Sequence, residues 1–183
     1  MAKHAVISLA TGFEEIEATS VVDVLRRAGV DVTIAGLQAG TIQGSHGIKV
    51  VPDTTIGEIE IKNFDAVILP GGNPGYVNLG RDKRVLDVVK TAFELGKIVA
   101  GICAGPSVLA QTGILKGKKA TIFPGMESAL TGAKPLNERV VVDGNLVTSQ
   151  GPGTALEFAL TLVELLVGKQ KAQEVKTGLI AKF

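Results

Sequence analysis

The chain has 183 residues, of which 45% are hydrophobic and 20% are charged, and its formal net charge at pH 7 is +1. This balance is typical of one globular domain with a sizeable core, and it excludes disordered and fibrous proteins. A net charge so close to zero gives no sign of a nucleic-acid or membrane partner. We therefore expect a single domain over residues 1–183.

The chain contains one cysteine and two histidines. A single cysteine cannot form an intrachain disulfide, so a reducing cytoplasm is the expected compartment. Because paired cysteines are absent and only His4 and His46 offer imidazole ligands, we expect no transition-metal site. No apolar run approaches the roughly 20 residues that span a bilayer, and the N-terminal apolar run 5–10 is too short for a signal peptide.

Short apolar runs alternate with helical patterns along the chain, which predicts βα units and a mostly parallel sheet. In chain order, the predicted elements are strand 5–10, helix 14–28, strand 30–35, a β excursion over 41–51, strand 65–69, helix 82–95, strand 98–102, a short helix after Cys103, a hairpin of 139–142 with 145–149, and helix 154–167. The hairpin follows from Asp143 and Gly144 at its turn. The last helix is apolar on most sides, so it is either deeply buried or shared with a partner subunit.

Cys103 lies between the predicted strand 98–102 and a helix, with Gly101 and Gly105 two residues away on either side. This is the cysteine counterpart of the Gly-X-Ser-X-Gly nucleophile elbow, in which flanking glycines relieve crowding in a sharp turn. The helix N-terminus favours a thiolate there, and the amides after the turn can stabilise an oxyanion. The alternative is a buried cysteine that packs as a small apolar residue.

Two further turns end at the same edge of the predicted sheet, where ligands bind in open parallel sheets. The segment 70–73 carries two adjacent glycines that let the backbone approach a ligand, although a plain turn explains them as well. The segment 149–154 is a second strand-to-helix turn that either closes the pocket or serves only as a loop and helix cap.

Three glutamates open the first predicted helix. Complementing the helix dipole fully explains Glu14 and Glu15, whereas Glu17 lies deeper, beside apolar neighbours. A partly buried Glu17 would have a raised pKa and could exchange a proton with a nearby thiol. A cysteine hydrolase usually pairs its thiol with a histidine base, and the sequence gives weak support for one here. His4 opens the first strand, at the opposite edge of the sheet, and His46 is expected to be a solvated loop residue.

Five motifs in this order cover essentially the whole chain and make it resemble the ThiJ/PfpI superfamily, in the branch of the parkinsonism-associated protein deglycase and bacterial YajL. These motifs are residues 12–17, 22–29, 69–73, 102–106 and 148–154. The resemblance implies a flavodoxin-like three-layer sandwich, a homodimer and an oxidation-sensitive Cys103. It also implies that Glu17 is the protonated partner of that cysteine and that Gly72 and Ala104 are backbone donors to it. The remaining pocket residues would be Gly71, Asn73, Phe123, Gly151 and Pro152.

Two departures from the family pattern bear on the chemistry. Some members have a histidine where this chain has Phe123, and the protease-like members have one where this chain has Ala104. The second departure argues against peptidase activity, and the first leaves Glu17 as the only evident proton carrier.

Two functions remain open on this basis. In the first, a Cys103 thiolate adds to a reactive carbonyl, either methylglyoxal or its adduct on a glycated protein, and Glu17 moves protons until lactate forms without any cofactor. In the second, the protein is a non-enzymatic oxidative-stress sensor or redox-dependent chaperone whose Cys103 oxidises to a sulfinate. A phosphate- or nucleotide-binding module is the weakest alternative, because no glycine-rich phosphate motif follows any predicted strand.

Overall fold

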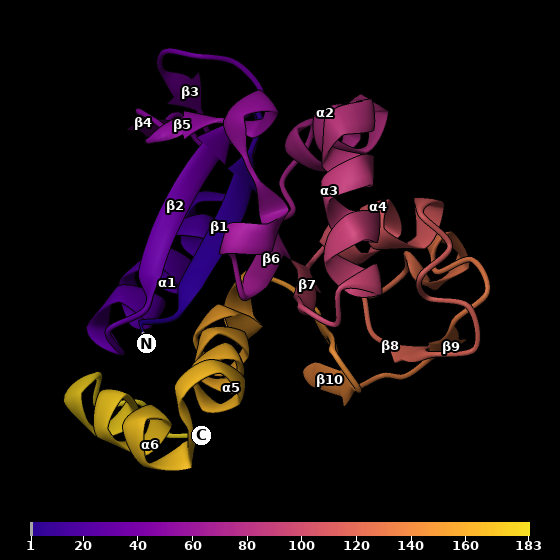
Figure 1. The fold of residues 1–183 in the computed structure, drawn as a ribbon. Coiled ribbons are helices and arrows are strands. Elements are labelled where there is room, and N and C mark those ends of the chain that lie inside the picture. The colour runs from indigo at the N-terminus through magenta and orange to yellow at the C-terminus, as the bar shows by residue number, and fades with distance from the viewer. Residues whose placement is uncertain (1) are drawn as a thin grey trace.

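The computed structural model describes residues 2–183 as a seven-stranded sheet between two layers of helices (Figure 1). The strand order is β10-β11-β7-β6-β1-β2-β5, and every neighbouring pair is parallel except β10 with β11. The chain runs outward from β1 to β2 and then returns to the other side of β1, which is the flavodoxin-like arrangement. The predicted three-layer α/β sandwich is thereby confirmed.

The strands of the main sheet are β1 (His4–Leu9), β2 (Asp31–Gly36), β5 (Thr54–Thr55), β6 (Ala66–Leu69), β7 (Ile98–Ile102), β10 (Val140–Asp143) and β11 (Leu146–Ser149). The helices are α1 (Glu15–Arg27), α2 (Gly75–Arg81), α3 (Lys83–Glu94), α4 (Gly105–Gln111), α5 (Ala155–Val167) and α6 (Lys169–Gly178). Two small ribbons pair β3 (Ile42–Gln43) with β4 (Lys49–Val50), and β8 (Lys119–Ala120) with β9 (Lys134–Pro135).

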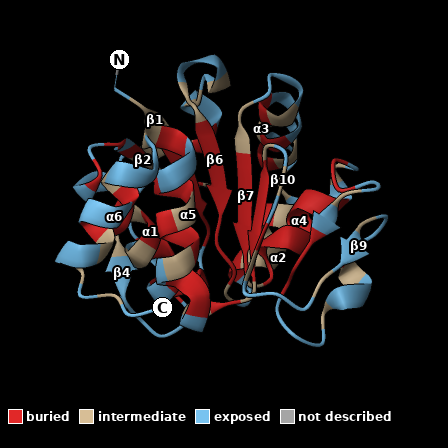
Figure 2. Ribbon diagram, turned by 90° about the horizontal axis from the view of Figure 1, so that it is seen from below, coloured by how far each residue is buried: buried red, intermediate tan, exposed pale blue. Residues whose placement is uncertain are grey.

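Each face of the sheet has its own apolar core. Helices α1, α5 and α6 pack on one face around fully buried Phe13 and Phe158, and α2, α3 and α4 pack on the other around Leu79 and Leu109. Figure 2 shows the buried strands enclosed by helices whose outer surfaces are exposed. Among residues 2–183, no helix combines the length and apolarity that a membrane crossing requires.

The apolar helix α5 is buried within its own chain, where it packs against α1, β11 and α6. This packing agrees with deep burial, but Leu156 and Leu165 on α5 are 40% and 44% exposed, so the alternative of a helix shared with a partner subunit stays a prediction. Helices α2 and α6 were not expected from the sequence. The hairpin at Asp143 and Gly144 and the β excursion over 41–51 are both present.

Candidate active site at Cys103

Cys103 immediately follows β7 and precedes α4, with a backbone φ of 60°. A non-glycine residue in this left-handed region is uncommon and persists only where the surrounding structure holds it. Here the Cys103 N–H donates to the Ser149 carbonyl at 2.9 Å, and the Cys103 carbonyl accepts from the Phe123 N–H at 3.1 Å. The thiol is thus held at the carboxyl edge of the sheet in the sharp turn that the elbow pattern predicts.

The two glycines after β6 are required by this crowding. A Cβ on Gly71 would lie 3.0 Å from Cys103 Sγ and 2.8 Å from its Cβ. Gly72 has a φ of 91°, and a Cβ there would lie 2.2 Å from the backbone nitrogen of Glu14. Glycine at position 71 allows the backbone to approach the sulfur this closely, and glycine at position 72 allows it to pass the backbone of residues 12–14. The plain-turn explanation of these residues is therefore insufficient.

Glu17 lies in the first turn of α1 and is completely buried. Its Oε2 accepts a hydrogen bond from the Gly71 N–H at 2.7 Å, which fixes the carboxyl group beside the same glycine that touches the sulfur. Its Oε1 is buried without a nitrogen or oxygen partner in the described part of the chain. The titratable group next to the carboxyl is the Cys103 thiol, and each alters the pKa of the other.

Burial governs the protonation of this pair. It raises the pKa of Glu17 from 4.5 to about 7, against the opposing effect of the Gly71 amide. Burial, together with the charge of Glu17, also raises the pKa of Cys103 to about 12, while the amides of Ala104 and Gly72 act in the opposite direction. Those two amides are therefore in position to stabilise negative charge at the sulfur.

Above neutral pH, Cys103 and Glu17 together retain one proton, which can reside on the sulfur or on the carboxyl group. In one arrangement a thiol faces a carboxylate, and in the other a thiolate faces a carboxylic acid. Moving the proton from sulfur to Glu17 removes the charge that raises the pKa of Cys103. A nucleophilic thiolate is therefore obtained by a single proton transfer across one contact, without a histidine.

The apolar side of the site comes from the segments that follow β8 and β11. The ring of Phe123 lies over Gly151, where an added Cβ would be 3.3 Å from its Cδ2. Gly151 is buried and Pro152 is half-buried at the start of the turn before α5, while Asn73 is exposed on the turn after β6. The structure thus gathers most of the predicted pocket residues around Cys103 and leaves Asn73 at the rim.

Glu15 has a different role from the one its position predicts. It is 4% exposed, and its Oε1 accepts hydrogen bonds from the backbone of His46 at 2.6 Å and of Ile48 at 3.3 Å. Its Oε2 contacts His46 Nδ1 at 3.0 Å and Ser45 Oγ at 3.2 Å. The helix-dipole explanation of Glu15 is therefore incomplete, because this carboxylate fastens the loop between β3 and β4 to α1.

His46 is exposed as expected, but its ring pairs with Glu15 instead of standing free in solvent. Glu14, Glu15 and His46 form the group of possible metal ligands in residues 2–183, with one ligand atom from each lying within 4.8 Å of the others. The Glu15 oxygens in this group are already used by the loop, so the arrangement serves as a clamp. Sequence reasoning missed this clamp because its two halves are about thirty residues apart.

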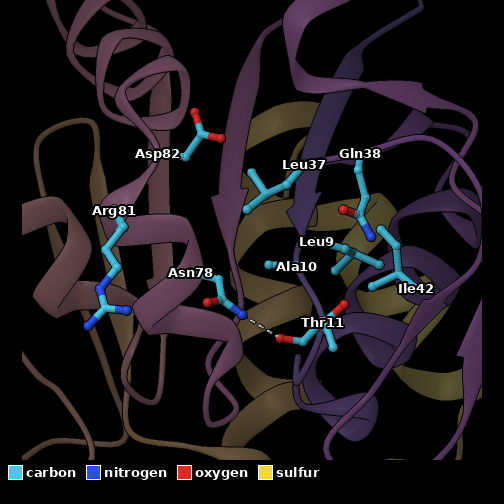
Figure 3. Close-up of a pocket in the computed structure, with 9 residues that line it drawn as sticks. All are labelled: Leu9, Ala10, Thr11, Leu37, Gln38, Ile42, Asn78, Arg81 and Asp82. Atoms are coloured by element: carbon cyan, nitrogen blue, oxygen red, sulfur yellow. Dashed lines mark hydrogen bonds between the residues drawn. The ribbon is translucent and has the colours of Figure 1, made fainter.

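A separate hollow of about 380 Å³ opens where β1 and β2 end, next to α2 (Figure 3). Its floor is apolar and includes Leu9 and Ile42, and none of the predicted site residues lines it. Two of the polar groups at its rim are engaged or turned away. Asn78 donates to the Thr11 carbonyl at 3.0 Å, and the Arg81 side chain points away from the hollow.

Comparison with known proteins finds relatives that match this chain over most or all of its length. The model of the DJ-1/PfpI family matches residues 3–165. Protein dj-1beta of Drosophila melanogaster is 43% identical over the full length of both chains, and its crystal structure superposes with a TM-score of 0.96. A Caenorhabditis elegans protein named glutathione-independent glyoxalase DJR-1.2 is 37% identical, covering 88% of this chain and 87% of its own. The oxidised DJ-1 of Toxoplasma gondii is 35% identical over both complete chains, with a TM-score of 0.94. This chain belongs to the DJ-1/PfpI family.

Proposed function

We propose that the protein converts small α-oxoaldehydes such as methylglyoxal, free or as early adducts on protein, into the corresponding 2-hydroxy acids. The observation that carries this proposal is the pairing of a single thiol with a buried carboxyl group and two amides. The glyoxalase name of the C. elegans relative supports the same class of reaction. Cys103 would be the nucleophile, Glu17 the proton carrier, and Gly72 and Ala104 the oxyanion donors.

The chemistry needs only groups of this chain, the substrate and water. Sulfur bonds to the aldehyde carbon while the thiol proton moves to Glu17, and the new oxyanion is stabilised by the amides of Gly72 and Ala104. Glu17 then passes its proton to that oxyanion, and the carboxylate so restored removes the hydrogen on the aldehyde carbon as a proton. Delivery of this proton to the neighbouring ketone carbon, while the hydroxyl proton passes to the ketone oxygen, oxidises the first carbon and reduces the second. The resulting thioester with Cys103 is hydrolysed by water, which releases the 2-hydroxy acid and restores the thiol.

The test is lactate formation from methylglyoxal by the wild type, Cys103→Ala and Glu17→Gln. Both variants should fall to the uncatalysed rate or close to it, because the first lacks the nucleophile and the second lacks a titrating carboxyl. Glu94→Gln, an exposed change at the end of α3, is the matched control and should retain full activity. Background turnover by the wild type would refute the enzyme proposal, and activity in Cys103→Ala would refute the assignment of the nucleophile.

The second candidate function is peroxide sensing at the same thiol. It is favoured by the half-buried state of Cys103 and by the amides of Ala104 and Gly72, which suit an anionic oxidised sulfur. Each hydrogen peroxide molecule would transfer one oxygen to sulfur and leave as water, giving first a sulfenate and then a sulfinate. Mass spectrometry after mild peroxide treatment should detect two added oxygen atoms on Cys103, and their absence would refute this function.

We also infer that the chain forms a homodimer through the α1 side of the sheet. A groove of about 230 Å³ with apolar walls runs between α1, β2 and β4, lined in part by Val22, Ile34 and Val50. Ile16 and Ile48 are more than half exposed on the same side of the molecule. Sedimentation should give about twice the chain mass of 18.9 kDa, and a species of the single-chain mass alone would exclude the dimer.

A further inference from the structure

Phe123 is a large aromatic side chain that stays 44% exposed beside the reactive turn. Burial of an aromatic ring is strongly favourable, so an exposed ring held in a fixed place is a candidate contact for a ligand. The ring belongs to the segment after β8, which runs across the carboxyl edge of the sheet.

The position of this ring is fixed by two connections to the nucleophile. The Phe123 N–H donates to the Cys103 carbonyl at 3.1 Å, so its backbone is tied to the cysteine itself. The ring lies over Gly151, two residues after Ser149, whose carbonyl accepts the Cys103 N–H. Both segments that hold the ring are therefore joined to the elbow.

The order of the strands separates the two sides of the sulfur. β7, which carries Cys103, lies between β6 and β11. The Gly71 and Gly72 backbone and the Glu17 carboxyl approach from the β6 side, whereas Phe123, Gly151 and Pro152 approach from the β11 side. Hydrogen-bonding and proton-carrying groups thus stand opposite an apolar wall.

The cation Arg139 on the β11 side is already paired within the chain. Arg139, at the start of the hairpin, donates to Glu157 at 2.6 Å and to the Gly153 carbonyl at 3.0 Å. These contacts hold the Arg139 guanidinium on Glu157 and Gly153, so it is not free to bind a polar substituent at the wall formed by Phe123 and Pro152.

We propose that Phe123 is a specificity-determining residue that selects α-oxoaldehydes whose ketone carbon bears an aromatic or other apolar substituent. This inference rests on the proposed function. With the aldehyde carbon on the sulfur and its oxygen at the Gly72 and Ala104 amides, the rest of the substrate extends away from the β6 side. Its substituent then packs against the Phe123 ring, where aromatic pairs are favoured over aliphatic contacts.

The test compares kcat/KM for phenylglyoxal and methylglyoxal in the wild type, Phe123→Ala and Phe123→Leu. The wild type should prefer phenylglyoxal, and Phe123→Ala should lower its kcat/KM about tenfold, mainly through KM, as expected for one lost aromatic contact. Methylglyoxal should change about twofold or less, and Phe123→Leu should be intermediate. Leu95→Ala, which removes a similarly exposed apolar side chain at the end of α3, is the control and should leave the ratio unchanged.

Equal losses on both substrates, or no loss on either, would overturn the assignment of Phe123. A second readout separates this inference from the failure of turnover, because the chain has one cysteine. Alkylation of Cys103 by 2-iodo-N-phenylacetamide should be faster than by iodoacetamide in the wild type, and Phe123→Ala should remove that preference. If the wild type turns over neither aldehyde, the proposed function fails, and the alkylation ratio alone then supports or refutes the apolar wall.

Discussion

Replacing Glu17 with glutamine should make the protein more stable at alkaline pH. Burial raises the pKa of Glu17 from 4.5 to about 7, so the folded state holds this proton more tightly than the unfolded chain does. The stability that this proton provides is fully present below pH 4.5 and is lost as the pH rises through 7. At about 1.4 kcal/mol for each pH unit between the two values, the loss is about 3 kcal/mol. Glutamine has no proton to lose, and its amide oxygen can still accept from Gly71.

Urea unfolding of the wild type and Glu17→Gln at pH 4.5, 6 and 8 measures this effect. The difference between the two free energies of unfolding should shift by about 3 kcal/mol in favour of the variant across this range. Apart from Cys103, whose pKa depends on Glu17, the other titrating groups are shared, so their contributions cancel in the difference. Glu94→Gln, at an exposed site, should track the wild type at every pH. A wild type and a Glu17→Gln variant with parallel pH profiles would refute the assignment of a raised pKa to Glu17.

Two further substitutions test the backbone and the clamp. Gly72→Ala should lower the free energy of unfolding by more than about 3 kcal/mol or prevent folding, because the added Cβ meets backbone atoms. Gly40 has a similar φ but lies in open space, so Gly40→Ala should lower it by only about 1–2 kcal/mol. Similar losses for the two variants in urea unfolding would contradict this account. Glu15→Gln should speed amide hydrogen exchange at Ile48 about tenfold, since the charged acceptor of that N–H is lost, and Glu14→Gln, which leaves that bond intact, should have little effect. Unchanged exchange in Glu15→Gln would show that the loop is held by other contacts.

The strands and longer helices of this fold could be predicted because their patterns are local. The strand 98–102 has the predicted bounds, since a parallel strand buried on both faces is apolar at nearly every position. Helix α1 ends near Arg27, where basic residues and Gly29 mark a helix end.

The unpredicted helices lack such patterns. α2 is seven residues long and contains Gly75 and Gly80, so its stability comes from tertiary packing around Leu79 and not from helix propensity. α6 is largely polar and buries only Ala172 and Val175, which leaves almost no apolar stripe to detect.

The reactive turn could be predicted from its glycines, but the protonation of its groups could not. A helix N-terminus beside Cys103 predicts a low thiol pKa, whereas burial and the neighbouring Glu17 act in the opposite direction. Burial of one side chain depends on segments from β1, β6 and β7 meeting at one edge of the sheet, and spacing along the chain does not contain that information.

Glu15 and Glu17 show this most clearly, because they lie two residues apart on α1 and have opposite environments. Burial alone would raise the pKa of Glu15, but hydrogen bonds from the side chain and backbone of His46 and from Ile48 lower it to about 2. Glu17 receives one amide hydrogen bond and no cation, so burial prevails and its pKa rises to about 7. Between about pH 2 and pH 7, the Glu15 carboxylate of the clamp is therefore ionised while Glu17 carries its proton.

The raised pKa of Glu17 determines the expected pH dependence of turnover. The active form of the pair is the one that retains a single proton, shared between Cys103 and Glu17, and it forms as the first proton leaves near pH 7. The kcat/KM for methylglyoxal should therefore rise through pH 7 and level off at higher pH, because kcat/KM reports the pKa values of the free enzyme. In Glu17→Gln the residual activity should lack this step, since only the thiol then titrates. A wild-type profile that is flat from pH 5.5 to 8.5 would exclude Glu17 as the proton carrier, even if Cys103 proved essential.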